Sequence, residues 1–378
     1  MKPFLFATAL LMSTIVGVGM FGLPYAGAQS GFLIAGIFLI ILTVIITILH
    51  LFYGEIVSRT KEKHRLVGYA EHYLGKTWKN LVTISVVVGF YGSLLVYIIV
   101  GGSFLYSIFS SILNLPPIFF NLLFFIIGST AVYLGVRFIS GLDLFMGFFL
   151  IFIVFLFLFL GFSQIDFNNL KSYNLKNIFI PYGVTLYSLA GMSIIPEIRE
   201  IFRGGNKNLY KKSIIFGTVI PGILYLVFMV AVIGLTGSNT SSEAIDGLVG
   251  MLGKKVILIG AIFGFLATIT SFFSLGLTLK ETFCYDFKIN KKIAWILACF
   301  VPLVLFLSGG YNFITVIIIL GSLMGGIEGT AIVLIYKQAK KFGNQEPDYN
   351  LGQMNIVRYI MVIVFILGFV YTIFRLIG

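Results

Sequence analysis

Residues 13–28, STIVGVGMFGLPYAGA, place several glycines and a proline inside the first long apolar run of the chain. Glycine lowers the steric cost of unwinding a helix, and proline removes a backbone hydrogen bond from it. An unwound helix frees N–H groups, which attract a carboxylate, and C=O groups, which attract an ammonium group or a metal cation. An amino acid carries both charges, so a break at this point could bind one through the backbone.

A second stretch, YSLAGMSIIPEIRE at residues 187–200, repeats this arrangement of small residues followed by a proline. We expect Pro24 and Pro196 to lie in the first turns of the outgoing half-helices, where a missing N–H costs little. For one glycine-rich helix, close packing against a neighbour is the better explanation, because small residues often serve that purpose in membranes. The matching second stretch favours a binding site made from two broken helices.

The composition of the chain places these breaks in a lipid bilayer. Of the 378 residues, 59% are hydrophobic and 11% are charged, and the mean hydropathy is +1.05. A soluble protein could not cover its surface with so few polar groups. Apolar runs of about 20 residues indicate membrane helices, whereas a membrane barrel would show short alternating segments. We therefore predict an all-α integral membrane protein, with residues 1–378 forming a single transporter domain.

The apolar runs predict about eleven transmembrane helices. Their expected spans are 4–29, 32–57, 81–109, 118–135, 142–163, 178–202, 213–236, 256–284, 293–308, 313–337 and 357–377. The interrupted helices are the first and the sixth, so each begins a group of five, at about residues 4–163 and 178–337, and the last helix is an addition. Because five is odd, the second group enters from the opposite side, which is the inverted-repeat layout of many secondary transporters. We also expect an amphipathic helix within 58–80 and a short lid helix within 237–255.

The basic residues are distributed unevenly between the loops. If the N-terminus is cytoplasmic, the loops on that side hold 21 of the 26 Lys and Arg residues. The positive-inside rule therefore predicts a multi-pass protein of the cell membrane with the N-terminus inside and, for an odd helix count, the C-terminus outside. This topology explains the net charge of +12, and no nucleic-acid partner is needed. The first apolar run imitates a secretory signal but is too long for one, so we expect it to be retained.

Other classes of protein have little support in the sequence. Cys284 and Cys299 lie in or beside expected helices, and the three histidines form no metal-binding pattern, so a metal centre is not predicted. No convergent set of His, Asp, Cys or Ser indicates an enzyme, and no GxxxxGK[ST] loop indicates ATP hydrolysis. We therefore expect no cofactor other than Na⁺ or H⁺ as a coupling ion. An ion channel is the alternative, although charge within the expected spans is scarce.

Three regions in order along the chain resemble the aromatic and hydroxy amino acid permeases. They are STIVGVGMFGLP at 13–24, SIIP at 193–196 with its continuation to 221, and TSFFSLGLTLKE at 270–281. These permeases belong to the amino acid/auxin permeases and to the amino acid-polyamine-organocation superfamily. The resemblance implies a symporter for amino acids, with aromatic or large neutral ones as the expected substrates, that works by alternating access. Its partners would be a small-molecule amino acid and the lipid bilayer.

The resemblance also implies where the substrate lies, which is between the unwound parts of helices 1 and 6. The implied backbone contacts come from Val16, Gly17, Val18, Gly19, Met20, Leu189, Ala190 and Gly191. Ser193 could add a hydroxyl contact, or it could instead make a helix-packing hydrogen bond. A tyrosine of helix 3 reaches the substrate carboxylate in relatives with this fold, which makes Tyr97 a candidate, with packing or interfacial anchoring as the alternative.

Two sets of residues are candidates for ion coupling. Ala267, Thr270 and Ser271 fall at i, i+3 and i+4 on one face of helix 8. Sodium-coupled transporters of this fold use a similar set together with helix 1 carbonyls, which here would belong to Ser13 and Val16. The alternative is that the hydroxyl groups bond to their own preceding turn. Some proton-coupled relatives place a lysine of helix 5 at this position, but residues 142–163 contain none.

Glu328 is the acidic residue nearest the middle of an expected span. A carboxylate in a membrane is costly unless it is neutral or paired, so Glu328 is a candidate proton carrier. A structural hydrogen bond to a neighbouring helix is the alternative. Glu55, Glu197 and Glu281 lie closer to cytoplasmic ends, where we expect them to pair with Arg or Lys.

Overall fold

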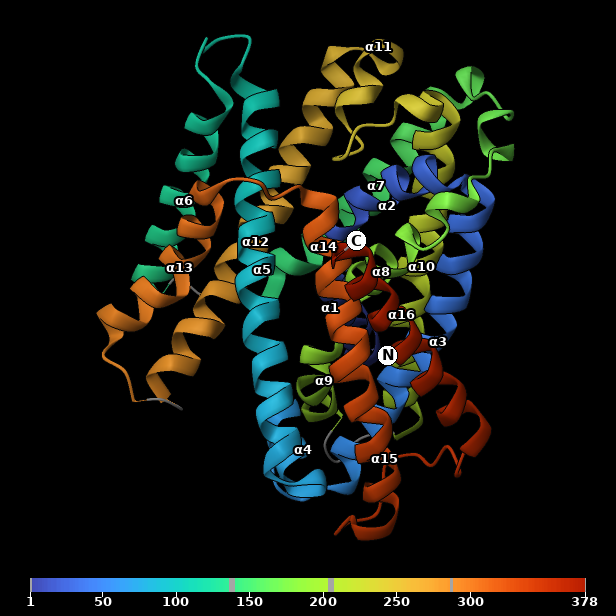
Figure 1. Cartoon of the computed structure of the whole chain (residues 1–378), viewed down its shortest axis with the longest axis vertical. Helices are drawn as coiled ribbons and strands as arrows, with labels where there is room; N and C mark the ends of the chain where they lie inside the picture. Colours follow the sequence, from blue (N-terminus) through green and yellow to red (C-terminus); the bar gives the residue numbers. More distant parts are fainter. Residues whose placement is uncertain (1, 136–139, 203–206, 286–287, 378) are drawn as a thin grey trace.

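The computed structural model describes residues 2–135, 140–202, 207–285 and 288–377, and almost all of its regular structure is helical (Figure 1). The α-helices are α1 (Lys2–Ile15), α2 (Gly19–Ser30), α3 (Phe32–Arg59), α4 (Leu66–Leu74), α5 (Lys76–Phe109), α6 (Pro117–Leu134), α7 (Ser140–Gly161), α8 (Ile180–Ser188), α9 (Ile195–Ile201), α10 (Lys207–Thr236), α11 (Val249–Leu252), α12 (Lys254–Tyr285), α13 (Lys291–Ser308), α14 (Phe313–Leu323), α15 (Thr330–Phe342) and α16 (Asn355–Ile377). A π-helical turn, Met324–Gly329, joins α14 to α15. The prediction of an all-helical membrane fold is confirmed.

Each expected span coincides with one helix or with one broken pair of helices. Among the described residues, eight helices are long and apolar enough to cross a membrane, and α1 with α2 adds a ninth span that is bent. The expected spans at 142–163 and 178–202 correspond to α7 and to the pair α8 and α9. The count of eleven therefore stays a prediction, while the positions of the helices agree with it.

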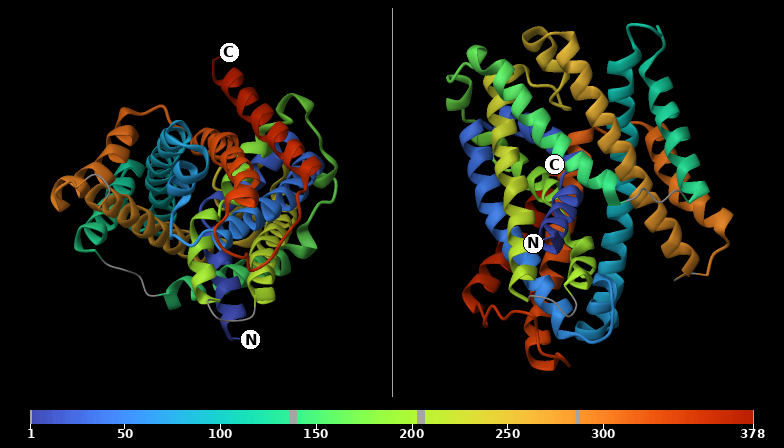
Figure 2. Two further views of the ribbon diagram at one scale, coloured as in Figure 1. Left: turned by 90° about the horizontal axis from the view of Figure 1, so that it is seen from below. Right: turned by 180° about the vertical axis from the view of Figure 1, so that it is seen from behind.

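The helices form two packed groups (Figure 2). Helices α6, α12 and α13 pack beside α5 and share a small aromatic-rich core. The larger core holds the two broken helices, because α1 packs on α10, α2 packs on α8, and α8 packs on α14. The breaks consequently lie inside the protein, where their backbone groups do not face lipid.

The two ends of the bundle differ in their short helices. The α4 helix forms within 58–80 as expected and lies at the same end as the last turns of α15, whereas α11 lies at the opposite end (Figure 1). The segment 237–255 holds α11 and two short 3₁₀ turns, which agrees with the expectation of a short helix there. The end that carries α4 is the one predicted to be cytoplasmic, and we call it the α4 end.

Candidate functional site

The first break separates α1 from α2. Helix α1 ends at Ile15, α2 begins at Gly19, and the two helices are bent by 56°. Within the described part of the chain, no amide donates to the carbonyl oxygens of Ser13 and Val16. These are the carbonyls that the sequence predicted to face a cation. Pro24 is a correction: it lies inside α2 beyond the first turn, because the new helix already starts at Gly19.

The second break separates α8 from α9. Helix α8 ends at Ser188, residues 189–191 are not helical, and a 3₁₀ turn leads into α9 at Ile195. Pro196 lies in the first turn of α9, as expected. Both interruptions that the sequence predicted are therefore present in the structure.

The two breaks meet each other at glycines. A Cβ atom added to Gly19 would lie 2.8 Å from the Cα atom of Ser188, so the backbones approach as closely as glycine allows. A Cβ added to Gly191 would lie 2.6 Å from the side chain of Ile15. Gly17 differs, because the nearest atom to its added Cβ is Ser271 Oγ at 4.0 Å. The backbone contact leaves no room for a side chain at Gly19, whereas a Cβ atom at Gly17 would make only an ordinary contact with α12.

Hydroxyl groups from three helices gather near the first break. The Tyr187 hydroxyl of α8 donates to Ser93 Oγ of α5 at 3.1 Å. The Tyr97 hydroxyl, also from α5, interacts with the hydroxyls of Tyr187 and Ser271. The structure thus brings Tyr97 and Ser271 together near Gly17, and it adds Tyr187 and Ser93, which the sequence analysis did not single out. Such hydroxyls can donate to a carboxylate and accept from an ammonium group.

Ser193 lies apart from this hydroxyl group. It is exposed in the turn before α9, and its backbone carbonyl accepts a hydrogen bond of 3.0 Å from Arg65 Nη1. The structure therefore brings Tyr97 and the backbone residues of the two breaks close together. It places Ser193 apart from them, nearer the α4 end.

The candidate ion ligands bond to their own helices. Ser13 donates to the Leu10 carbonyl, and Thr270 and Ser271 donate to carbonyls at 266 and 267. This agrees with the alternative reading, in which the hydroxyl groups satisfy the preceding turn. A hydroxyl that donates its proton keeps two lone pairs, so these bonds leave oxygen atoms that could accept from a cation. The sodium assignment therefore stays a prediction.

Glu328 lies in the π-helical turn between α14 and α15, with 7% of its surface exposed. Ser85 Oγ of α5 donates to Glu328 Oε1 at 2.9 Å, which is the structural hydrogen bond considered as the alternative. π-Helical turns are rare and often occur at functional sites, because they displace a side chain from the regular helical register. The proton-carrying role of Glu328 stays a prediction.

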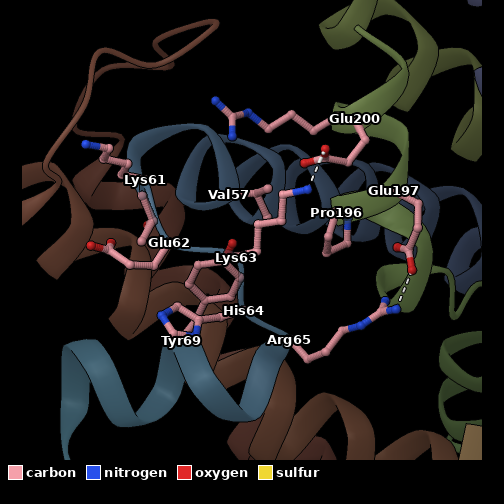
Figure 3. A pocket seen from close by; sticks show the side chains of 12 residues that line it. Val57, Lys61, Glu62, Lys63, His64, Arg65, Tyr69, Pro196, Glu197 and Glu200 are labelled. Atoms are coloured by element: carbon pink, nitrogen blue, oxygen red, sulfur yellow. Dashed lines mark hydrogen bonds and ion pairs between the residues drawn. The ribbon is translucent and has the colours of Figure 1, made fainter. Parts of the chain in front are cut away.

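A polar pocket of about 250 Å³ opens at the α4 end (Figure 3). It is lined by the α3–α4 connection and by α9, and ion pairs join these two elements. Arg65 pairs with Glu197, and Lys63 Nζ lies 2.9 Å from Glu200 Oε2. None of the predicted substrate residues lines this pocket, so it is not the predicted substrate site.

Loss of the Arg65 side chain is expected to weaken the contact between the α3–α4 connection and α9. Its side chain is 68% exposed, so its pair with Glu197 contributes at most about 1 kcal/mol, or roughly a fivefold change in the population of molecules in which this contact is broken. In a variant lacking both native cysteines, Ala190→Cys should react up to about five times faster with a charged thiol reagent after Arg65→Ala. Lys79→Ala is the control, because it removes an exposed pair with Glu71 that does not involve α9. Equal labelling rates in the two variants would contradict this role of Arg65.

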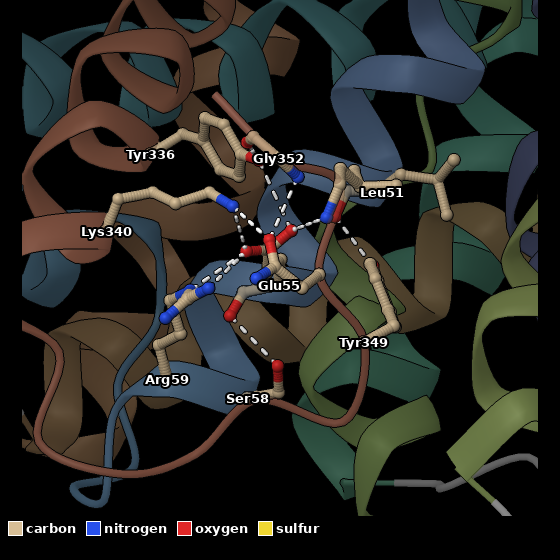
Figure 4. A network of polar contacts seen from close by, with 10 residues as sticks. Leu51, Glu55, Ser58, Arg59, Tyr336, Lys340, Tyr349 and Gly352 are labelled. Atoms are coloured by element: carbon tan, nitrogen blue, oxygen red, sulfur yellow. Dashed lines mark hydrogen bonds and ion pairs between the residues drawn. The ribbon is translucent and has the colours of Figure 1, made fainter. Parts of the chain in front are cut away.

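A second polar network lies at the α4 end around Glu55 (Figure 4). Glu55 is fully buried, and its Oε1 atom lies 2.8 Å from Arg59 and 2.9 Å from Lys340. Its Oε2 atom accepts from the Leu351 amide at 2.8 Å and from the Tyr336 hydroxyl at 3.3 Å. The expectation that Glu55 and Glu197 pair with Arg or Lys is confirmed, and Glu55 also connects α3 to α15 and to the segment before α16.

Two broken helices that meet at their breaks inside a helical membrane protein define the class of secondary transporters with inverted repeats. The structure is similar to that of MhsT in complex with L-phenylalanine, with a TM-score of 0.69 and 17% identity over 97% of this chain and 98% of that one. It is also similar to inward-facing Mhp1, with a TM-score of 0.65 and 14% identity over 99% and 90% of the two chains. At these identities the likeness concerns the fold.

The sequence model of the tryptophan/tyrosine permease family matches residues 1–374, so the chain belongs to that family and is an amino acid permease. It is 26% identical to tyrosine-specific transport system 1 of Haemophilus influenzae, over 73% of this chain and 71% of the relative. It is 25% identical to glutamine transporter 2 of Aliivibrio fischeri, over 79% and 80% of the two chains. The family that the first-helix residues resembled is thus confirmed at the level of these permeases.

Proposed function

We propose that the protein is a symporter that moves aromatic or large neutral amino acids across the cell membrane, coupled to a proton or sodium gradient. The observation that carries the proposal is the meeting of two helix breaks next to the Tyr97, Tyr187 and Ser271 hydroxyls. Unpaired carbonyls at the first break suit an ammonium group or a cation, and the helix start at Gly19 suits a carboxylate. The names of the two relatives, for tyrosine and glutamine, support an amino acid as the substrate.

The proposed membrane arrangement follows from the fold and the charges. The α4 end, which carries the Lys and Arg residues near 59–65 and 337–341, faces the cytoplasm. We further propose that residues 4–163 and 178–337 form the two repeats, with α16 as the additional helix and the C-terminus outside. Alternating access would then expose the breaks first at the α11 end and afterwards at the α4 end.

Uptake into proteoliposomes tests this function. The purified protein should accumulate L-tyrosine, L-tryptophan or L-glutamine when a sodium or proton gradient is imposed, and the panel of amino acids identifies the preferred one. Ion flux that needs no amino acid, together with no uptake under any gradient, would favour the channel alternative.

The same assay distinguishes the coupling ions through two substitutions. If sodium drives uptake, Thr270→Ala removes a candidate ligand hydroxyl and should lower the apparent sodium affinity about tenfold or more, the loss expected for one contact of ~1.4 kcal/mol. If protons drive uptake, Glu328→Gln should abolish the pH dependence while leaving exchange of labelled for unlabelled substrate. An unchanged ion dependence in both variants would contradict both assignments.

A further inference from the structure

One hydroxyl group bonds to both helix breaks. Tyr225 lies on α10 with 0% of its surface exposed, and its hydroxyl is 2.9 Å from the Ile15 carbonyl oxygen and 3.1 Å from the Ser188 carbonyl oxygen. Ile15 is the last residue of α1, and Ser188 is the last residue of α8. The last carbonyls of the two half-helices that lead into the breaks therefore lie within hydrogen-bond distance of the same side chain.

These two carbonyls need a partner from outside their own helices. The last carbonyls of a helix have no amide in the next turn to accept from, and leaving such a group unsatisfied inside a protein costs about 1–3 kcal/mol. At the breaks the following residues are not helical, so α1 and α8 cannot supply the missing donors. The Tyr225 hydroxyl supplies one donor that lies within reach of both carbonyls.

The arrangement also links the movement of the two breaks. A hydroxyl has one proton, so its bond is shared between Ile15 and Ser188 or alternates between them. If α1 moved away from α8, the hydroxyl could follow only one of the two carbonyls. Because the Gly19 backbone also approaches that of Ser188 closely, the hydroxyl bonds and the glycine contact both hold the two breaks together.

We propose that Tyr225 is a positioning residue of the transport site, whose hydroxyl fixes the ends of α1 and α8 relative to each other so that the two breaks hold the substrate as one unit. The proposal deepens the proposed function and rests on it for its effect on substrate binding. Its effect on the backbone at the breaks does not depend on the identity of the substrate.

Tyr225→Phe removes the hydroxyl and keeps the ring. The matched control is Tyr210→Phe, because Tyr210 is equally buried on the same helix and its hydroxyl also donates to a backbone carbonyl, that of Gly54, at 3.3 Å. We expect hydrogen exchange of the backbone amides in residues 13–20 and 186–194 to become faster in Tyr225→Phe and to stay unchanged in Tyr210→Phe. Equal exchange in these segments for the two variants would overturn the proposal.

Transport provides the second readout. In Tyr225→Phe the KM for radiolabelled L-tyrosine uptake should rise roughly 3- to 10-fold, as expected for the loss of one hydrogen bond, while Tyr210→Phe should leave it within about twofold. If the wild-type protein takes up no amino acid, the proposed function fails and hydrogen exchange still decides the role of Tyr225. If uptake is normal and both variants keep the wild-type KM, only the role of Tyr225 is wrong.

A third variant tests the proposal if Tyr225→Phe folds poorly. 3-Fluorotyrosine introduced at position 225 keeps the ring and the hydroxyl, adds one fluorine atom beside the hydroxyl and makes the hydroxyl a stronger donor. We expect slower exchange in residues 13–20 and 186–194 than in the wild type, and unchanged exchange would overturn the proposal.

Discussion

Gly19→Ala is expected to lower uptake efficiency roughly 100-fold, the effect associated with a displacement of about 1 Å in a site that must hold its ligand accurately. The added Cβ atom would lie 2.8 Å from both the Cα and the Oγ atoms of Ser188. A backbone atom cannot rotate away as a flexible side chain can, so α2 must move from α8. That movement separates the two breaks and costs about 1–3 kcal/mol of overpacking.

Gly89→Ala is the matched control for this prediction. Gly89 is buried in α5, yet an added Cβ would meet no atom within 4 Å beyond its chain neighbours and the backbone of its own helix. Alanine should therefore fit without strain and favour the helix by about 0.5–1 kcal/mol. Initial rates of uptake in proteoliposomes, measured at equal amounts of folded protein, compare the two variants. Wild-type uptake by Gly19→Ala would show that the breaks need no close contact.

Glu55→Gln is expected to destabilise the protein by about 3–5 kcal/mol, the range for breaking a buried ion pair on one side. The substitution leaves Arg59 and Lys340 without their common counter-charge, and their side chains are only 13% and 15% exposed. Glutamine has one acceptor oxygen where glutamate has two. The variant therefore loses either the acceptor for the Leu351 amide or the oxygen that faces Arg59 and Lys340. Detergent-solubilised protein should show a clearly lower Tm and less folded material.

Glu71→Gln serves as the control for Glu55→Gln. Glu71 pairs with Lys79 at 2.7 Å, but both side chains are about 40% exposed, and such a pair contributes about 0–1 kcal/mol. The Tm of this variant should stay close to that of the wild type. Similar losses of Tm in both variants would mean that the buried ion pairs of Glu55 stabilise the protein no more than the exposed pair of Glu71.

The membrane fold and the positions of the two helix breaks could be predicted from the order of the amino acids. Both follow from local properties, because composition selects lipid as the solvent and a glycine or proline acts on the backbone at its own position. The expectation for Pro24 was wrong for the same local reason: glycines at 17, 19 and 22 permit several starting points for α2, and the helix begins at Gly19, more than one turn before Pro24. The uneven distribution of Lys and Arg between the loops likewise predicted the orientation in the membrane, and this needed no knowledge of contacts between residues.

The side chains that face the breaks depend on how the helices pack against one another. Tyr225 has no sequence signal, since its partners are the carbonyls of Ile15 and Ser188 on two other helices. The bond between Ser85 and Glu328 likewise joins positions that are 243 residues apart. Helices that are apolar on all sides carry no periodic pattern to show which face is buried, so the facing of α5, α10 and α12 came from packing alone. The backbone breaks of the candidate site could therefore be predicted from the sequence. The side chains that complete the site depend on contacts between distant helices and could not.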